Sequence, residues 1–157
     1  MESNTRVIVN PVTGTVIPLI DVRDEIFSNK MMGDGFAVEP KDSLVVAPVN
    51  GVIVNVFPKQ HAIGIVTEDN IEMLIHMGIN TAAIRSKDAY HVLKKEGDHI
   101  TQGEPLAEMN LEVIASLNKD RTVITTFMDT SQIKNLKINT FGELEAGQEL
   151  GTYEVNV

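Results

Sequence analysis

The stretch His61–Thr81, with the sequence HAIGIVTEDNIEMLIHMGINT, predicts an antiparallel β-hairpin and holds two of the four histidines of the chain. Two β-rich apolar runs, 61–66 and 71–76, flank a short polar break. Runs of this kind around a short break are typical of a hairpin. We place the centre of the expected turn between Glu68 and Asp69.

This turn position also predicts a register for the hairpin. If the strands are symmetrical about the bond between Glu68 and Asp69, His61 lies directly opposite His76, and Ile63 lies opposite Leu74 on the same face. Residues directly opposite each other have Cβ atoms about 4.5–5.5 Å apart. A slip of one residue would break this pairing, because side chains alternate between the two faces of a sheet.

Two facing imidazoles are suited to phosphoryl transfer. Imidazole is a nucleophile that titrates near neutral pH, and its two nitrogens can have separate roles. One ring can accept a phosphoryl group while the other donates a hydrogen bond to the phosphoryl oxygens. The same pair also fits a partly buried structural contact or an adventitious metal site, and the hairpin alone does not separate these alternatives.

The segments around the pair point to one protein family. Segment 74–81, LIHMGINT, has apolar residues, His, an apolar residue, Gly, an apolar residue, a polar residue and Thr, and His61 precedes it by one hairpin. Together with segments 32–37 and 46–51 in the same order, it resembles the glucose-type enzyme IIA proteins of the bacterial sugar phosphotransferase system. The resemblance extends from about Val9 to the C-terminus.

Two internal repeats indicate the fold. Segment 10–17 resembles segment 47–54, each with Pro, an apolar residue, a turn residue, Gly and then a strand pattern. Segment 96–106 resembles segment 141–150. Two kinds of β-unit, each present twice, predict an all-β fold, a duplicated antiparallel β-sandwich or barrel. The family fold that the resemblance implies is of the same kind.

No linker or low-complexity tract divides the chain, so we expect residues 1–157 to form a single enzyme IIA domain. Residues 1–6 are polar and are expected to be a flexible tail. Short helices or helical turns are predicted in segments 21–30, 112–117 and 131–136.

The resemblance implies a phosphocarrier, a component of the phosphotransferase system. His76 would accept a phosphoryl group from a phosphohistidine of HPr and pass it to a cysteine of an enzyme IIB domain, in support of sugar uptake and phosphorylation. His61 would stabilise the phosphoryl oxygens. Gly78 would offer its carbonyl to the second ring nitrogen of His76, and Thr81 would support the site. The implied mechanism uses no metal and no cofactor.

The resemblance also implies a docking face around the histidines. Its expected members are Asp34, Phe36, Ile63, Leu74 and Asn80. Apolar side chains would exclude water and slow hydrolysis. Asp34 would attract basic residues of partners, although its glycine-bracketed position also fits an ordinary turn former.

Several residues depart from the family pattern. Asn80 stands where the family usually has Asp, and Lys59 stands where Thr is common. Asn70 replaces a turn glycine, and segment 85–90 lacks the usual glycines before an aromatic residue. The chain is therefore identified as a divergent member. A regulatory protein-binding module of the same fold, with weak or no transfer, is the alternative.

Composition limits the other possibilities. The 157 residues carry a net charge of −9, which disfavours binding to nucleic acids and to anionic membranes. The chain has no cysteine, which excludes thiol chemistry. A partner with a basic patch fits this charge. We find no signal peptide pattern and no apolar run long enough to span a bilayer, so the expected location is the cytoplasm.

The sequence disfavours two further classes of protein. A biotinyl- or lipoyl-like carrier needs a lysine at a hairpin tip, where this chain has Glu68 and Asp69. A zinc peptidase on a related β-fold needs a His-x-His pair and further ligands, and no such pair occurs. His91 and His99 lie in polar stretches and are expected to be ordinary solvated histidines.

Overall fold

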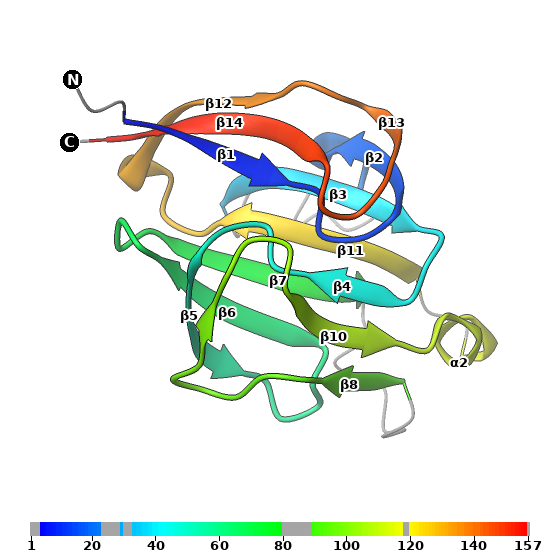
Figure 1. The fold of residues 1–157 in the computed structure, drawn as a ribbon. Helices are drawn as coiled ribbons and strands as arrows, with labels where there is room; N and C mark the ends of the chain where they lie inside the picture. Colours follow the sequence, from blue (N-terminus) through cyan, green and yellow to red (C-terminus); the bar gives the residue numbers. More distant parts are fainter. Residues whose placement is uncertain (1–3, 23–28, 30–32, 80–88, 118–119, 157) are drawn as a thin grey trace.

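The chain forms three antiparallel β-sheets within the residues that this computed structural model describes, which are 4–22, 29, 33–79, 89–117 and 120–156 (Figure 1). The largest sheet contains, in spatial order, β13 (Gly142–Leu144), β2 (Gly14–Pro18), β3 (Asp34–Pro40), β11 (Asp120–Phe127), β7 (Glu72–Ile79), β6 (Ala62–Thr67), β5 (Gly51–Val56) and β9 (His99–Ile100). The two smaller sheets contain β1 (Thr5–Val9), β14 (Glu149–Val155) and β12 (Ile133–Ile138), and β4 (Leu44–Val46), β10 (Pro105–Met109) and β8 (Tyr90–Val92).

The sheet order confirms the predicted all-β, duplicated architecture. The large sheet has the same order from either end when β13, β2, β3 and β11 are matched with β9, β5, β6 and β7. The two small sheets match in the same way, since β14 lies between β1 and β12 just as β10 lies between β4 and β8. The repeated sequence segments lead into β2 and β5, and they span β9–β10 and β13–β14.

One buried core joins the three sheets. Its members include Ile8 of β1, Val45 of β4, Leu106 of β10 and Tyr153 of β14, which pack with residues of the large sheet. Valine, isoleucine, leucine and methionine dominate it, as expected for a chain with few aromatic residues and no Trp. In the described part of the chain, no helix is both long and apolar enough for a membrane crossing.

Glycine is required at Gly14 and at Gly51 for the same structural reason. A Cβ atom on Gly14 would lie 2.1 Å from the backbone oxygen of Glu39 in β3. A Cβ atom on Gly51 would lie 2.3 Å from the backbone oxygen of Val66 in β6. Each glycine therefore lets two neighbouring strands approach closely, at matching places in the two halves.

We expect Gly51→Ala to lower the free energy of unfolding by about 1–3 kcal/mol, because backbone atoms must move to admit the methyl group. Urea unfolding of the variant measures this loss. Gly64→Ala in the adjacent strand is the matched control, since its Cβ atom would meet nothing closer than 3.4 Å. Equal losses in both variants would contradict the close-approach explanation.

The helix predictions have mixed outcomes. Segment 112–117 is confirmed as helical by α2 (Leu111–Ser116), whose first turn is capped by the Asn110 side chain. The prediction for segment 131–136 is wrong beyond its first turn. A short 3-10 helix, η3 (Thr130–Gln132), leads directly into β12, which pairs with β14. Most of segment 21–30 lies outside the described residues, and a 3-10 helix, η1 (Leu19–Asp21), ends at its first residue.

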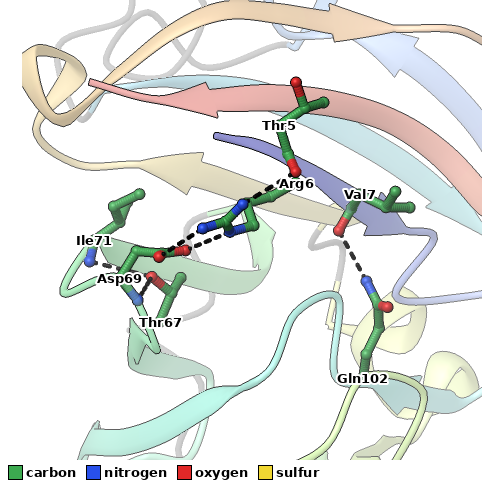
Figure 2. Close-up of polar contacts among 7 residues, drawn as sticks. All are labelled: Thr5, Arg6, Val7, Thr67, Asp69, Ile71 and Gln102. Atoms are coloured by element: carbon green, nitrogen blue, oxygen red, sulfur yellow. Dashed lines mark hydrogen bonds and ion pairs between the residues drawn. The ribbon is translucent and has the colours of Figure 1, made fainter. Parts of the chain in front are cut away.

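The expected flexible tail at residues 1–6 is too long. Thr5 and Arg6 belong to β1, which pairs with β14. Arg6 also donates two hydrogen bonds to Asp69, Nε to Oδ2 at 2.8 Å and Nη2 to Oδ1 at 3.1 Å, and so joins β1 to the turn between β6 and β7 (Figure 2). Figure 2 also shows Gln102 donating to the carbonyl of Val7. These contacts join β1 to the neighbouring parts of the fold.

Candidate functional site

Strands β6 and β7 form the predicted hairpin, but the predicted register is wrong by one residue. His76 pairs with Ala62, and Ile63 pairs with Ile75. The turn is a three-residue loop closed by a 2.9 Å hydrogen bond from Thr67 N to Ile71 O, and Asn70 at its end has a φ of 63°. Three-residue hairpin loops typically end in such a left-handed residue, which Asn tolerates well.

His61 and His76 nevertheless lie together. Their ring centroids are 5.2 Å apart, with the rings nearly perpendicular at 76°. His61 is placed just before β6, where strand alternation no longer dictates its direction. The tight turn Phe57–Gln60, closed by a 2.7 Å bond from Gln60 N to Phe57 O, ends with Gln60 in the left-handed region at φ 60°. The turn delivers His61 to the end of β7.

The ring of His76 is oriented by the backbone two residues later. Its Nδ1 lies 2.6 Å from the carbonyl oxygen of Gly78. A carbonyl only accepts, so Nδ1 carries the proton, and Nε2 is then the nitrogen with the lone pair. Gly78 has a φ of 90°, a conformation that favours glycine and that directs its carbonyl back toward the ring. The bond that the resemblance implied is present.

His61 is kept neutral by its surroundings. Its side chain is buried, with 6% exposed, and the ring of Phe57 packs against it with centroids 5.6 Å apart. Its Nδ1 is buried and has no hydrogen-bond partner among the described residues. Burial, followed by the charges of His76 and Lys59, lowers the pKa of His61 to about 4. At neutral pH His61 therefore offers one N–H, and the unpartnered Nδ1 favours the tautomer with that proton on Nε2.

The pKa of His61 predicts a loss of stability in mild acid. Its ordinary pKa of 6.5 applies to the unfolded chain, whereas the folded pKa is about 4. The stabilisation is complete above pH 6.5 and is lost as pH falls toward 4, because the unfolded chain binds the proton first. We expect the free energy of unfolding, measured with urea, to fall more steeply over this range in the native protein than in His61→Gln. Identical slopes would contradict the assignment.

An apolar row lies beside His76 on one face of the large sheet. The strand register places side by side, across five strands, Ile17, Ala37, Ile124, His76 and Ala62. The first three pack in a small cluster with Leu19 and Val22 that is separate from the main core. Leu74, two residues before His76 on β7, shares this face and is 3% exposed. The face beside His76 is therefore apolar.

Two members of the expected docking face lie on the wrong side of the sheet. Phe36 and Ile63 are 0% exposed and belong to the main core. Phe36 alternates with Ala37 on β3, and Ile63 pairs with Ile75, so both point away from the face of His76. The expectation that they contact partners is corrected: they support the sheet from behind. The register error of one residue is the cause for Ile63.

The remaining predicted residues are only partly placed. Asp34 is half-buried at the start of β3, and its Oδ1 accepts from Gly35 N at 2.8 Å. It lies three residues along the strands and two strands across from His76, about 10 Å in each direction. Asn80 and Thr81 lie outside the described residues, so their roles stay predictions.

Three residues beside the pair were not predicted from the sequence. Phe57 packs on His61, Gln60 turns the chain before it, and Tyr90 donates from its hydroxyl to the carbonyl of Met77 at 2.9 Å. The Phe-Pro sequence at 57–58 marks a turn, which could have drawn attention to Phe57 and Gln60. Nothing in the local sequence connects Tyr90 with this site, because Tyr90 lies 14 residues after His76 on a different strand.

The other histidines and the metal alternative can now be placed. His91 and His99 are exposed, which confirms them as solvated side chains. In the ranges that the structure describes, no three His, Asp or Glu side chains are grouped closely enough to hold a metal ion.

Comparisons with known proteins match the chain to one protein family. A sequence model of the family described as phosphoenolpyruvate-dependent sugar phosphotransferase system, EIIA 1, matches residues 6–133. The solved structure of glucose permease IIA from Mycoplasma capricolum superimposes with a TM-score of 0.88 at 30% identity, covering 94% of this chain and 95% of that one.

Two relatives differ in the share of their length that this chain matches. The PTS system glucose-specific EIIA component of Staphylococcus aureus (strain MSSA476) is 36% identical over 136 residues, which cover 87% of this chain and 80% of that protein. The PTS system glucose-specific EIICBA component of Staphylococcus carnosus (strain TM300) is 37% identical over 144 residues, or 92% of this chain and 21% of that protein. The chain thus spans about a fifth of the length of this EIICBA relative.

Proposed function

This chain belongs to the EIIA 1 family of the phosphoenolpyruvate-dependent sugar phosphotransferase system, and on that premise we propose that it is a phosphocarrier. It takes a phosphoryl group from phospho-HPr on His76 and passes the group to a cysteine of an enzyme IIB domain. Membership of the family makes the chain a phosphotransferase-system protein. The transfer chemistry, the partners and a cytoplasmic location are the proposal.

One observation carries the proposal, namely the 2.6 Å contact between His76 Nδ1 and the carbonyl of Gly78 beside the second imidazole of His61. It makes Nε2 the basic, nucleophilic nitrogen without any need to remove a proton first. It also fixes the ring in one orientation, which lowers the entropic cost of reaching an in-line geometry.

The chemical step exchanges one phosphorus–nitrogen bond for another. The lone pair of His76 Nε2 forms a bond to phosphorus, while the bond from phosphorus to the HPr histidine breaks and its electron pair returns to that imidazole. In the onward step a thiolate of enzyme IIB attacks phosphorus, and the electron pair of the breaking bond returns to His76. No atoms are gained or lost, and the carrier ends as it began.

Partner binding is supported by charge and by the composition of a relative. The net charge of −9 favours partners with basic patches, whereas the apolar row beside His76 is largely buried and excludes water from that side of the site. The name EIICBA joins an A component to B and C components in one relative, which supports an enzyme IIB domain as the next acceptor.

Incubation with phosphoenolpyruvate, enzyme I and HPr, followed by intact mass measurement, tests the proposal. We expect a single acid-labile phosphoryl adduct that forms only when HPr is present and that moves to enzyme IIB when the phosphorylated protein, freed of phosphoenolpyruvate and enzyme I, is mixed with it. A folded protein that stays unmodified would overturn the carrier function, and a regulatory binding module with the same fold would then be the better description.

A further inference from the structure

We propose that strand β8 positions the two histidines relative to each other, through the hydroxyl of Tyr90 and the backbone N–H of Val92. This inference rests on the proposed function for its meaning, because it assigns positioning residues to the same site. Tyr90 and Gln60 are the side chains that carry it, and neither has a place in the phosphocarrier role derived above.

The first contact acts on the segment that follows His76. Tyr90 is buried, with 4% exposed, and its hydroxyl donates to the carbonyl oxygen of Met77 at 2.9 Å. This carbonyl belongs to the peptide group that contains the nitrogen of Gly78. The bond therefore fixes the peptide plane from which Gly78, at φ 90°, directs its own carbonyl to His76 Nδ1.

Met77 also contacts the segment that carries the other histidine. The N–H of Met77 donates to the carbonyl oxygen of His61 at 2.7 Å. The N–H of Met77 is thus bonded to His61, and its carbonyl oxygen is bonded to Tyr90. A shift of Met77 would move the carbonyl that orients His76 and the backbone of His61 together, so the hydroxyl of Tyr90 acts on both rings.

The second contact acts on the turn before His61. The backbone N–H of Val92 donates to the side-chain oxygen Oε1 of Gln60 at 2.8 Å. Gln60 has a left-handed conformation that costs energy for a residue other than glycine, and this bond helps to offset the cost. Tyr90 and Val92, the first and last residues of β8, therefore each hold one of the two segments that carry the histidines.

β8 is itself firmly placed. Tyr90 pairs with Met109, and Val92 pairs with Ala107, both in β10. β10 belongs to a small sheet that contributes Val45, Leu106 and Met109, among others, to the main core. The two contacts from Tyr90 and Val92, together called the clamp, are therefore anchored in the core of the protein. They come from a strand that is separated in sequence from both histidines. Misplacement of a reacting group by about 1 Å can cost about 100-fold in rate, so such anchoring matters.

Tyr90→Phe is the decisive variant, because it removes the hydroxyl and keeps the ring. Tyr153→Phe is the matched control, since Tyr153 is the other tyrosine, is 2% exposed and packs on Phe127 instead. The first measurement is the nitrogen-15 NMR spectrum of the histidine rings in the unphosphorylated protein. We expect the Nδ1 and Nε2 shifts of His76 to move toward each other in Tyr90→Phe, as the two tautomers mix, and to stay unchanged in Tyr153→Phe.

The second measurement is the rate of phosphoryl acceptance from phospho-HPr. We expect kcat to fall about tenfold in Tyr90→Phe with KM for HPr unchanged, since one hydrogen bond that orients the nucleophile is lost while the docking face is intact. Gln60→Met, which removes the acceptor of the Val92 N–H at similar size, should shift the ring resonances of His61 in the same spectra.

Unchanged ring resonances in both Tyr90→Phe and Gln60→Met would overturn the proposal, as would equal changes in Tyr153→Phe. If Tyr90→Phe did not fold, the spectrum of Gln60→Met would decide alone. A native protein that accepts no phosphoryl group would remove the proposed function, whereas the nitrogen-15 comparison would still establish or refute the clamp. Failure of one inference is therefore distinguishable from failure of the other.

Discussion

His76→Gln should show no phosphoryl adduct after incubation with phosphoenolpyruvate, enzyme I and HPr. Glutamine lacks a nitrogen lone pair that can attack phosphorus, because its amide nitrogen is conjugated with the carbonyl. Loss of the nucleophile removes the covalent step entirely, so we expect acceptance to fall by at least about 10⁴-fold. Intact mass under conditions that preserve acid-labile groups measures the result.

The control for this variant is His99→Gln. His99 is exposed on β9, at the edge of the large sheet, and takes no part in the histidine pair. It should be phosphorylated as fast as the native protein. A retained adduct in a folded His76→Gln protein would show that another residue is the acceptor. Loss of the adduct in His99→Gln as well would point to a defect in the assay or in docking.

The sequence predicted the architecture well because its patterns are local and repeated. Glycines at matching places, such as Gly14 and Gly51, are required wherever two strands approach closely, and the duplication presents that requirement twice. The hairpin between β6 and β7 was also evident, since two apolar runs surround one polar break. The contact between His76 and Gly78 could be expected because it spans only two residues.

The register and the orientation of side chains depend on features that are less visible in sequence. A loop of three residues instead of two or four moves every pairing by one position, and the choice here depends on Asn70 adopting a positive φ. That single shift transferred Ile63 from the expected docking face to the core. The rings of His61 and His76 meet because the turn ending at Gln60 alters the chain before β6, not because the two residues pair.

Contacts between distant segments were outside the reach of local patterns. Tyr90 reaches the carbonyl of Met77 only because β10 and the small sheet place β8 against the end of β7. The bidentate pair between Arg6 and Asp69 likewise joins segments far apart in the chain. The sequence patterns predict a flexible tail for Arg6 and a turn for Asp69, and neither pattern indicates a contact between them. Such pairings follow from packing of the completed fold.

His61→Gln should accept a phosphoryl group but pass it on slowly. When His76 is loaded, the nucleophile is a neutral imidazole, so it adds no negative charge to that of the phosphoryl group. In onward transfer a thiolate approaches a phosphoryl dianion, and two negative charges come together. His61 lies 5.2 Å from His76 between ring centroids, and a dianion there would raise the pKa of His61 and favour its protonated form. Glutamine can donate an N–H but cannot take up that proton.

We expect single-turnover transfer from phosphorylated His61→Gln to enzyme IIB to be about 10²–10³-fold slower than from the native protein, comparable to the loss of one preorganised donor at a site of developing charge. Decay of the adduct by intact mass measures this rate, and loading is measured in the same experiment before enzyme IIB is added. Onward transfer at the native rate would mean that His61 is only a buried packing partner of Phe57, and the stabilising role would have to be assigned elsewhere.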